Sequence, residues 1–247
     1  MKLPHFLSSY LKQSRELLQA HDETRAMSLA VGGDFEAVGV VEFCLLKQWG
    51  LRPGHRLIDV GCGSGRLAAQ LASYLQSGYL GLDVVPELLD YARRVCARED
   101  WTFRLAPGTH IGEPDASADF IVFFSVFTHL HHEETYRYLR DAARVLRPGG
   151  TLVFSFLEFR VPSHWAVFES SVNDEREEKV LNQFLDRDLI GAFARSLNLV
   201  IVTLQDGDLA HIPLDRSVVW DDGREMSGLG SLGQSVCVLR HQLRRET

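Results

Sequence analysis

The sequence predicts an α/β fold in which a doubly wound, mostly parallel sheet carries helices on both faces. Apolar runs of strand length alternate with helical patterns from Leu57 onward, beginning with RLIDV and RLAAQLASYLQ and continuing with YLGLDV and PELLDYARRVCARE. The runs DFIVFFSVF and TLVFSFL are continuously apolar, which is typical of strands covered on both faces. Strands that alternate with helices form parallel sheets through right-handed crossovers.

Individual elements follow from their local patterns. Pro86 suits the first turn of a helix, and the helix after the run at 119–127 has Glu133 and Glu134 near its start and arginines toward its end, which complements the helix dipole. RPGG ends that helix before the strand at 151–157. A helix is expected at 187–198 and strands at 199–205 and 235–242. The polar, turn-rich connections at 158–186 and 206–232 are predicted to be long loops.

The composition fits one globular unit. With 247 residues, of which 45% are hydrophobic, the chain can bury one large core. No apolar run approaches the roughly 18 residues of a membrane span. The N-terminal run alternates apolar and charged residues, as an amphipathic helix does and a signal peptide does not. We therefore expect a soluble, cytoplasmic protein and no membrane partner, and its oligomeric state stays open.

Charge and cysteine content argue against several classes of protein. The formal net charge of -7 gives no general attraction to phosphate backbones, so nucleic acid is not expected as a partner. The four cysteines include no C-x-x-C pair, which argues against a disulfide framework and a zinc site. The histidines in THLHH have no carboxylate or cysteine at ligand spacing, so no metal is expected.

The segment LIDVGCGSGRLAAQL predicts a ligand site. Ligands of parallel α/β sheets bind beyond the carboxyl ends of the strands, where the loop of Gly61, Cys62, Gly63 and Gly65 is expected to lie. Glycines allow restricted backbone angles and close approach of a ligand, and the helix that follows presents free N–H groups. An ordinary strand-to-helix turn is the alternative interpretation.

Two acidic residues narrow the type of ligand. Asp59 lies in the strand before the glycine loop, where a buried carboxylate needs a cation or hydrogen-bond donors. Asp83 closes the next strand, the position from which a carboxylate accepts hydrogen bonds from ribose hydroxyls. Each acid alone could be structural, but together they indicate a nucleoside that also carries a cationic group. The G-x-G-x-G spacing differs from the G-x-G-x-x-G that suits a dinucleotide pyrophosphate.

Four motifs in order, LIDVGCGSGRLA, YLGLDVV, ADFIVFFSVFTHL and DAARVLRPGGTLVFSFL, resemble those of the class I S-adenosylmethionine-dependent methyltransferases. The resemblance is firm from about Arg56 to Leu157. It implies a Rossmann-like, seven-stranded sheet whose last strand, within LGQSVCVLRH, is antiparallel. It also implies S-adenosylmethionine as cofactor and S-adenosylhomocysteine as product.

The same resemblance implies roles for individual residues. The glycine loop would contact the methionine portion of the cofactor, with Asp59 near its ammonium group, Asp83 on the ribose and Val84 against the adenine. Ser125 and Val126 would lie near the methionine end and the substrate entrance. FRLAPGTH lacks the acid that many relatives place near the adenine, so backbone near Gly108 and Thr109 is expected to serve.

The division of the chain also follows from the resemblance. Residues 1–50 would form a helical segment that closes on the cofactor site, and residues 51–247 the methyltransferase domain. Gly32-Gly33 would then act as a hinge or a point of close contact. The alternative is a plain loop in which Asp34 caps the next helix.

Methyl transfer from a sulfonium needs orientation above all, and a general base only where the acceptor must lose a proton. His129 and Glu158 are the candidates for that base, and packing roles are the alternative for both. The leading hypothesis is in-line methyl transfer to an O or N nucleophile of a small-molecule acceptor. A nicotinamide-dependent oxidoreductase and a non-catalytic cofactor-binding module remain the alternatives, and the acceptor stays unidentified.

Overall fold

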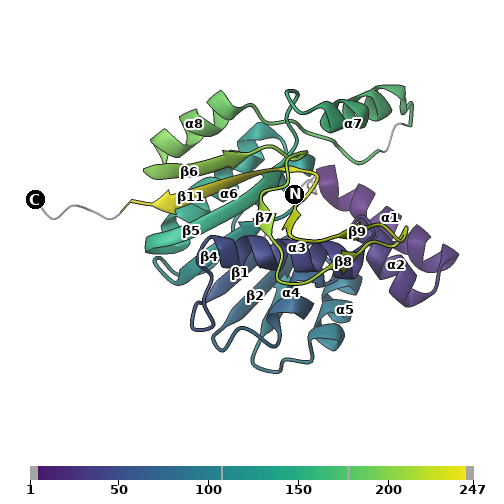
Figure 1. Ribbon diagram of the computed structural model, residues 1–247, viewed down its shortest axis with the longest axis horizontal. Helices are drawn as coiled ribbons and strands as arrows, with labels where there is room; N and C mark the ends of the chain where they lie inside the picture. Colours follow the sequence, from purple (N-terminus) through teal and green to yellow (C-terminus); the bar gives the residue numbers. More distant parts are fainter. Residues whose placement is uncertain (1–4, 107, 177–178, 243–247) are drawn as a thin grey trace, which may run out of the picture.

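A computed structural model describes residues 5–106, 108–176 and 179–242. Its centre is a seven-stranded sheet in the order β3-β2-β1-β4-β5-β11-β6 (Figure 1). The strands are β1 (Leu57–Val60), β2 (Tyr79–Asp83), β3 (Thr102–Leu105), β4 (Ala118–Phe123), β5 (Leu146–Phe156), β6 (Leu199–Gln205) and β11 (Ser235–His241). The first five are parallel, and β11 runs antiparallel to β5 and β6. The predicted fold class, including its antiparallel last strand, is confirmed.

Alternate residues of each strand point to opposite faces, and each face has its own apolar core. Leu57 and Val122 contribute to one core with side chains of the helices α3, α4 and α5, whereas Ile58 and Ile121 contribute to the other with α6 and α8. These helices are α3 (Phe35–Gln48), α4 (Arg66–Leu71), α5 (Pro86–Cys96), α6 (His132–Val145) and α8 (Arg187–Ser196). Strands covered on both faces explain the continuous apolar runs of the sequence.

The N-terminal region forms three helices before the first strand. The predicted amphipathic run is divided between α1 (His5–Ala20) and α2 (Glu23–Ala30), because Asp22 caps α2 by accepting a hydrogen bond from the Arg25 amide. Asp34 does not cap α3: it adopts a left-handed backbone conformation, and its side chain makes no capping hydrogen bond. The capping alternative for Asp34 is therefore wrong.

The two long connections contain more regular structure than predicted. Residues 158–186 include the helix α7 (Pro162–Asn173), whose only fully buried residue is His164, so the sequence shows no apolar stripe. The second connection contains two small two-stranded sheets. One pairs β7 (Ile212–Pro213) with β10 (Leu229–Gly230), and the other is a hairpin of β8 (Val218–Val219) and β9 (Glu225–Met226) that lies between them in the chain. The prediction of plain loops is wrong for these segments.

Two predicted boundaries also shift. α4 ends at Leu71, although the amides of Tyr74 and Leu75 still donate to the Leu71 carbonyl. β5 begins at Leu146 and includes RPGG, because Ala118 of β4 pairs with Leu146 before an irregularity in the register. The remaining predicted strands and helices agree with the structure to within a few residues.

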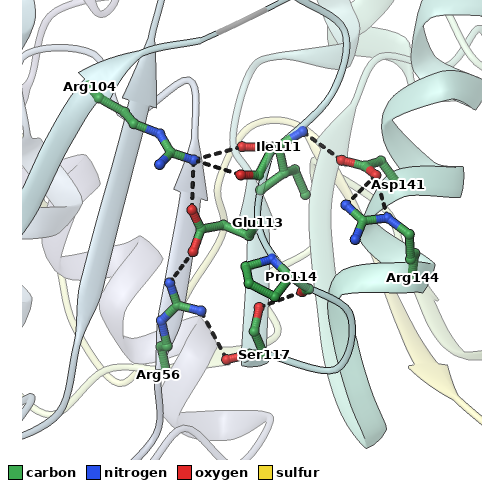
Figure 2. A network of polar contacts seen from close by, with 9 residues as sticks. Arg56, Arg104, Ile111, Glu113, Pro114, Ser117, Asp141 and Arg144 are labelled. Carbon is green, nitrogen blue, oxygen red and sulfur yellow. Dashed lines mark hydrogen bonds and ion pairs between the residues drawn. The ribbon is translucent and has the colours of Figure 1, made fainter.

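An ion-pair network fixes the connection between β3 and β4 (Figure 2). Glu113 accepts hydrogen bonds from Arg56 and from Arg104, and Asp141 of α6 accepts from the Ile111 amide at 2.7 Å. Burial by itself raises the pKa of Glu113, but the two guanidinium groups outweigh it and hold the pKa below its ordinary value. This connection reaches the cavity described below.

Within the ranges that the structure describes, the helices are too short or too polar to cross a bilayer.

Candidate functional site

A cavity of about 370 Å³ opens at the carboxyl ends of β1, β2 and β4. This is the point where the strand order reverses, since β2 and β4 lie on opposite sides of β1. Its size is that of a small-molecule site. The predicted site residues that line it are Asp59, Gly61, Cys62, Gly63, Asp83, Val84, Ser125, Val126 and His129.

The glycine loop is in close contact with two neighbouring segments. A Cβ on Gly61 would overlap the Val126 side chain, and a Cβ on Gly63 would overlap the Val31 side chain. Val126 and Val31 can therefore pack this closely only because both loop positions are glycine. Gly63 also has a φ of +54°, in the left-handed region that disfavours other residues. Gly65 does not line the cavity; a Cβ there would lie 2.8 Å from that of Ala92, so this glycine allows α4 and α5 to pack together.

Asp83 binds the glycine loop through backbone hydrogen bonds. Its Oδ1 accepts from the amides of Val84 and Val85 at 2.7 and 3.0 Å, and its Oδ2 accepts from the Gly63 amide at 2.9 Å. Burial raises the pKa of Asp83, and these three donors partly offset that effect. Because each carboxylate oxygen has two lone-pair positions, Oδ2 keeps one for a ligand hydroxyl.

Two further carboxyl groups line the cavity. Asp59 accepts from the Tyr79 hydroxyl at 2.8 Å, but burial outweighs this hydrogen bond and raises its pKa to about 7. Glu42 of α3 accepts from Arg66 at 2.6 Å, and Arg66 also donates to the Val31 carbonyl. Arg66 is the only lysine or arginine of the described cavity lining, and these contacts occupy it. The cavity therefore favours a ligand that carries positive charge.

Ser125 follows β4 in a left-handed conformation with a φ of +57°, which is unusual for a residue other than glycine. Its amide donates to the Ser155 hydroxyl at 2.7 Å, which in turn donates to Gln234. The Gln234 amide then donates back to the Ser125 hydroxyl at 3.1 Å. This closed network stabilises a strained residue at the cavity wall, as is common at functional sites.

His129 ends the short 3₁₀ helix η1 (Phe127–His129) and lines the cavity. Its Nδ1 lies 2.7 Å from the Leu181 carbonyl, which can only accept, so Nδ1 carries the hydrogen. Burial lowers the pKa of the ring, which is therefore neutral at pH 7 with a lone pair on Nε2. Tyr10 packs edge-on against it, with ring centroids 5.4 Å apart.

The three predicted site residues not yet described, Glu158, Gly108 and Thr109, lie outside the cavity lining. Glu158 is buried in a bidentate ion pair with Arg187 and accepts from the Ser235 hydroxyl at 2.5 Å, so its carboxylate is committed to structural contacts. Gly108 and Thr109 do not line the cavity either. The Tyr138 hydroxyl, which does, donates to the Gly108 carbonyl at 2.6 Å and so connects that loop to the cavity.

Several lining residues carried no signal in the sequence. Apart from Arg66, which follows the glycine loop directly, they come from other parts of the chain and are Tyr10, Gln13, Leu29, Ala30, Val31, Glu42, Tyr138, Val180 and Gln234. The pointers in the sequence were the expectation that the N-terminal helices close on the site and the Gly32-Gly33 pair, of which Gly32 lines the cavity. Among the residues that the structure describes, no three His, Cys, Asp or Glu side chains are arranged to hold a metal ion.

The fold and the position of the cavity are typical of a nucleoside-binding α/β protein. Comparison with known proteins shows similarity to methyltransferases. The family model for a methyltransferase domain matches residues 58–154. A demethylmenaquinone methyltransferase of Tropheryma whipplei (strain Twist) is 37% identical over 108 residues, 43% of this chain and 44% of that protein. The 27-O-demethylrifamycin SV methyltransferase of Amycolatopsis mediterranei is 35% identical over 106 residues, 41% of this chain and 38% of that protein.

Solved structures agree in fold. A putative methyltransferase in complex with the Haloferax volcanii Trm112 activator superposes with a TM-score of 0.64 at 15% identity, covering 100% of both chains. A possible histamine N-methyltransferase of Thermotoga maritima gives 0.59 at 16% identity over 84% of this chain and 92% of that one. The chain contains a methyltransferase domain at residues 58–154 and is similar to class I S-adenosylmethionine-dependent methyltransferases. It spans less than half the length of the curated relatives named above.

Proposed function

We propose that the protein transfers a methyl group from S-adenosylmethionine to an O or N nucleophile of a small-molecule acceptor. The observation that carries the proposal is the cavity at the strand switch point, where a glycine loop, Asp83 and further carboxyl groups meet the neutral imidazole of His129. The names of the two relatives, which refer to a demethylmenaquinone and a demethylrifamycin, support a small-molecule acceptor.

The residues present fit this cofactor. Gly61 and Gly63 line the cavity with backbone alone and pack closely against Val126 and Val31, and Asp83 Oδ2 keeps a lone pair for a ribose hydroxyl. Asp59 would supply a carboxyl group for the ammonium group, and Ser125 and Val126 would lie beside the methionine end. When bound, the cofactor supplies an activated methyl group. The protein contributes orientation and exclusion of water.

His129 is positioned to accept a proton from the acceptor. With Nδ1 directed to the Leu181 carbonyl, the lone pair on Nε2 is the basic site of the ring. Burial lowers the pKa of His129, which keeps this lone pair available at neutral pH. We assign the role of general base to His129 and not to Glu158, whose carboxylate is held by Arg187.

Calorimetric titration with S-adenosylmethionine and S-adenosylhomocysteine tests the cofactor. Asp83→Asn should weaken binding tenfold or more, about 1.4 kcal/mol, because a carboxylate acceptor at the ribose is lost. Asp90→Asn is the matched control, since Asp90 is exposed and pairs with Arg93 on its own helix. No binding of either compound to the wild-type protein would refute the proposal.

The same preparation separates the alternatives. An increase in NADH fluorescence on addition of the protein, with no binding of S-adenosylhomocysteine, would favour the nicotinamide-dependent oxidoreductase. Binding of S-adenosylhomocysteine without methyl transfer to any member of a broad hydroxyl and amine panel would favour the non-catalytic module.

A further inference from the structure

One wall of the cavity belongs to the N-terminal region and not to the sheet. Leu29, Ala30, Val31 and Gly32 line the cavity where α2 ends. Three contacts connect this wall to the glycine loop. Val31 packs on Gly63, the Ser64 hydroxyl donates to the Met27 carbonyl at 2.8 Å, and Arg66 donates to the Val31 carbonyl at 2.6 Å. The position of the turn at 31–34 therefore determines the shape of the cofactor site.

The turn is closed onto α2 by its own backbone. The amides of Gly32 and Gly33 donate to the Leu29 and Ser28 carbonyls at 3.0 and 2.8 Å. Both glycines have positive φ angles, +93° and +82°, and a Cβ on either would meet nothing within 4 Å. Because glycine has the largest backbone freedom of any residue, contacts from outside the turn add to these two hydrogen bonds in fixing it.

The tip of the β8–β9 hairpin supplies such contacts. The Asp221 carboxylate forms an ion pair with Arg25 of α2 at 2.7 Å and accepts from the Asp34 amide at 3.3 Å. The Asp221 amide donates to the Asp34 carboxylate at 2.6 Å. Asp221 therefore connects the start of α2 with the end of the turn. Asp34 directs its side chain here, which explains why it does not cap α3.

The hairpin itself is fixed to the body of the protein. The Trp220 amide donates to the Arg224 carbonyl at 2.9 Å and closes the hairpin turn. Asp215 pairs with Lys47 of α3 at 2.9 Å, and Arg216 donates to Gln70 at 2.7 Å. Figure 1 shows the hairpin beside α2 and α3, although Asp34 and Asp221 lie 187 residues apart in the sequence.

We propose that Asp221 is a positioning residue for the cofactor: it holds the turn at 31–34, and with it Val31, against the glycine loop. This inference rests on the proposed function. Asp221 is not part of the cavity lining, so it acts through the turn and touches no bound ligand. The β8–β9 hairpin, inserted between β6 and β11, thereby gains a role in binding.

The test compares Asp221→Ala with Asp222→Ala in the 247-residue chain. Asp222 is the neighbouring exposed carboxylate, and its side chain bonds to Arg224 within the hairpin and not to α2. Hydrogen exchange without ligand should show faster exchange at the amides of residues 25–34 in Asp221→Ala only. S-adenosylhomocysteine should bind at least threefold more weakly to this variant in calorimetry. Asp221→Glu, which retains the carboxylate, should restore most of the affinity.

Equal exchange at residues 25–34 in the two alanine variants would overturn the proposal, and so would equal affinities. A lower melting temperature of Asp221→Ala together with faster exchange throughout the sheet would also overturn the proposal, in favour of a general structural role. Failure of the wild-type protein to bind S-adenosylhomocysteine would instead refute the proposed function and remove the cofactor role of Asp221, whatever the exchange data show.

Discussion

At His129, burial and one carbonyl contact determine how the side chain can act. The Leu181 carbonyl accepts the hydrogen of Nδ1, which selects one tautomer, and the low pKa caused by burial disfavours the imidazolium. Leu181 lies 52 residues after His129 in the sequence, in the connection that also contains α7. The chemical state of this residue therefore depends on a segment with no recognisable motif.

His129→Gln should lower the rate of methyl transfer to a hydroxyl acceptor by about 100-fold to 10,000-fold, because the acceptor proton loses its base. Since burial holds the pKa of His129 below 6.5, the wild-type rate should stay level near pH 7 and fall only at lower pH, where the ring becomes protonated. Steady-state kinetics across pH 5–8 measure both effects. Unchanged affinity for S-adenosylhomocysteine is the control, and an unchanged rate would exclude the base role.

At the scale of elements, the contact between α2 and the glycine loop depends on the absence of one side chain. A Cβ on Gly63 would overlap Val31, so either the loop or the end of α2 must move. Overpacking of this kind commonly costs about 1–3 kcal/mol. The same contact forms one wall of the cavity, so stability and binding are coupled here.

Gly63→Ala should lower the free energy of unfolding by about 1–3 kcal/mol more than Gly50→Ala, and only Gly63→Ala should weaken binding of S-adenosylhomocysteine. Gly50 is a matched control, since its φ is also positive, at +93°, but a Cβ there would meet nothing within 4 Å. Because a φ of +93° is at least as unfavourable for alanine as one of +54°, backbone strain alone would not make Gly63→Ala the more destabilising variant. Urea unfolding measures stability, and equal losses in the two variants would show that the contact with Val31 contributes little.

Elements with a buried stripe or a continuous apolar run were predictable from sequence, and elements without one were not. β4 and β5 are covered on both faces, so their apolar runs identify them. α7 buries only His164 and leaves Trp165 and Val172 exposed, so no helical period appears. In the site, Asp59 lies within β1 and Asp83 ends β2, so the positions of both could be predicted. Gln234 reaches Ser125 from 109 residues away, a contact that no local pattern predicts.

At the scale of the whole molecule, acidic charge is concentrated where the cofactor is proposed to bind. Glu42, Asp59 and Asp83 come from three different elements and line one cavity, and burial raises the pKa of each. Bringing such groups together disfavours their ionised forms in the free protein. A bound ammonium or sulfonium group would relieve this cost, so the ligand-free protein is prepared for a cationic ligand.

The pKa of Asp59, about 7 in the folded protein against 3.8 ordinarily, also makes stability depend on pH. The folded state retains a proton that the unfolded chain has already lost between these values, so stability falls as pH rises. The contribution of Asp59 to the free energy of unfolding is fully present below about pH 3.8 and is lost as pH rises through about 7. A pKa difference of this size corresponds to about 4 kcal/mol.

Binding of a cationic cofactor should therefore release a proton from Asp59. At pH 6 the carboxyl group is mostly protonated, and the ammonium group of S-adenosylhomocysteine would favour its ionised form. Calorimetry at pH 6 in buffers of different ionisation enthalpy should show release of up to about one proton per ligand, and at pH 8 much less. Asp59→Asn should abolish the difference. Affinity should also increase from pH 6 to pH 8 in the wild-type protein, and affinity independent of pH would place the ammonium group away from Asp59.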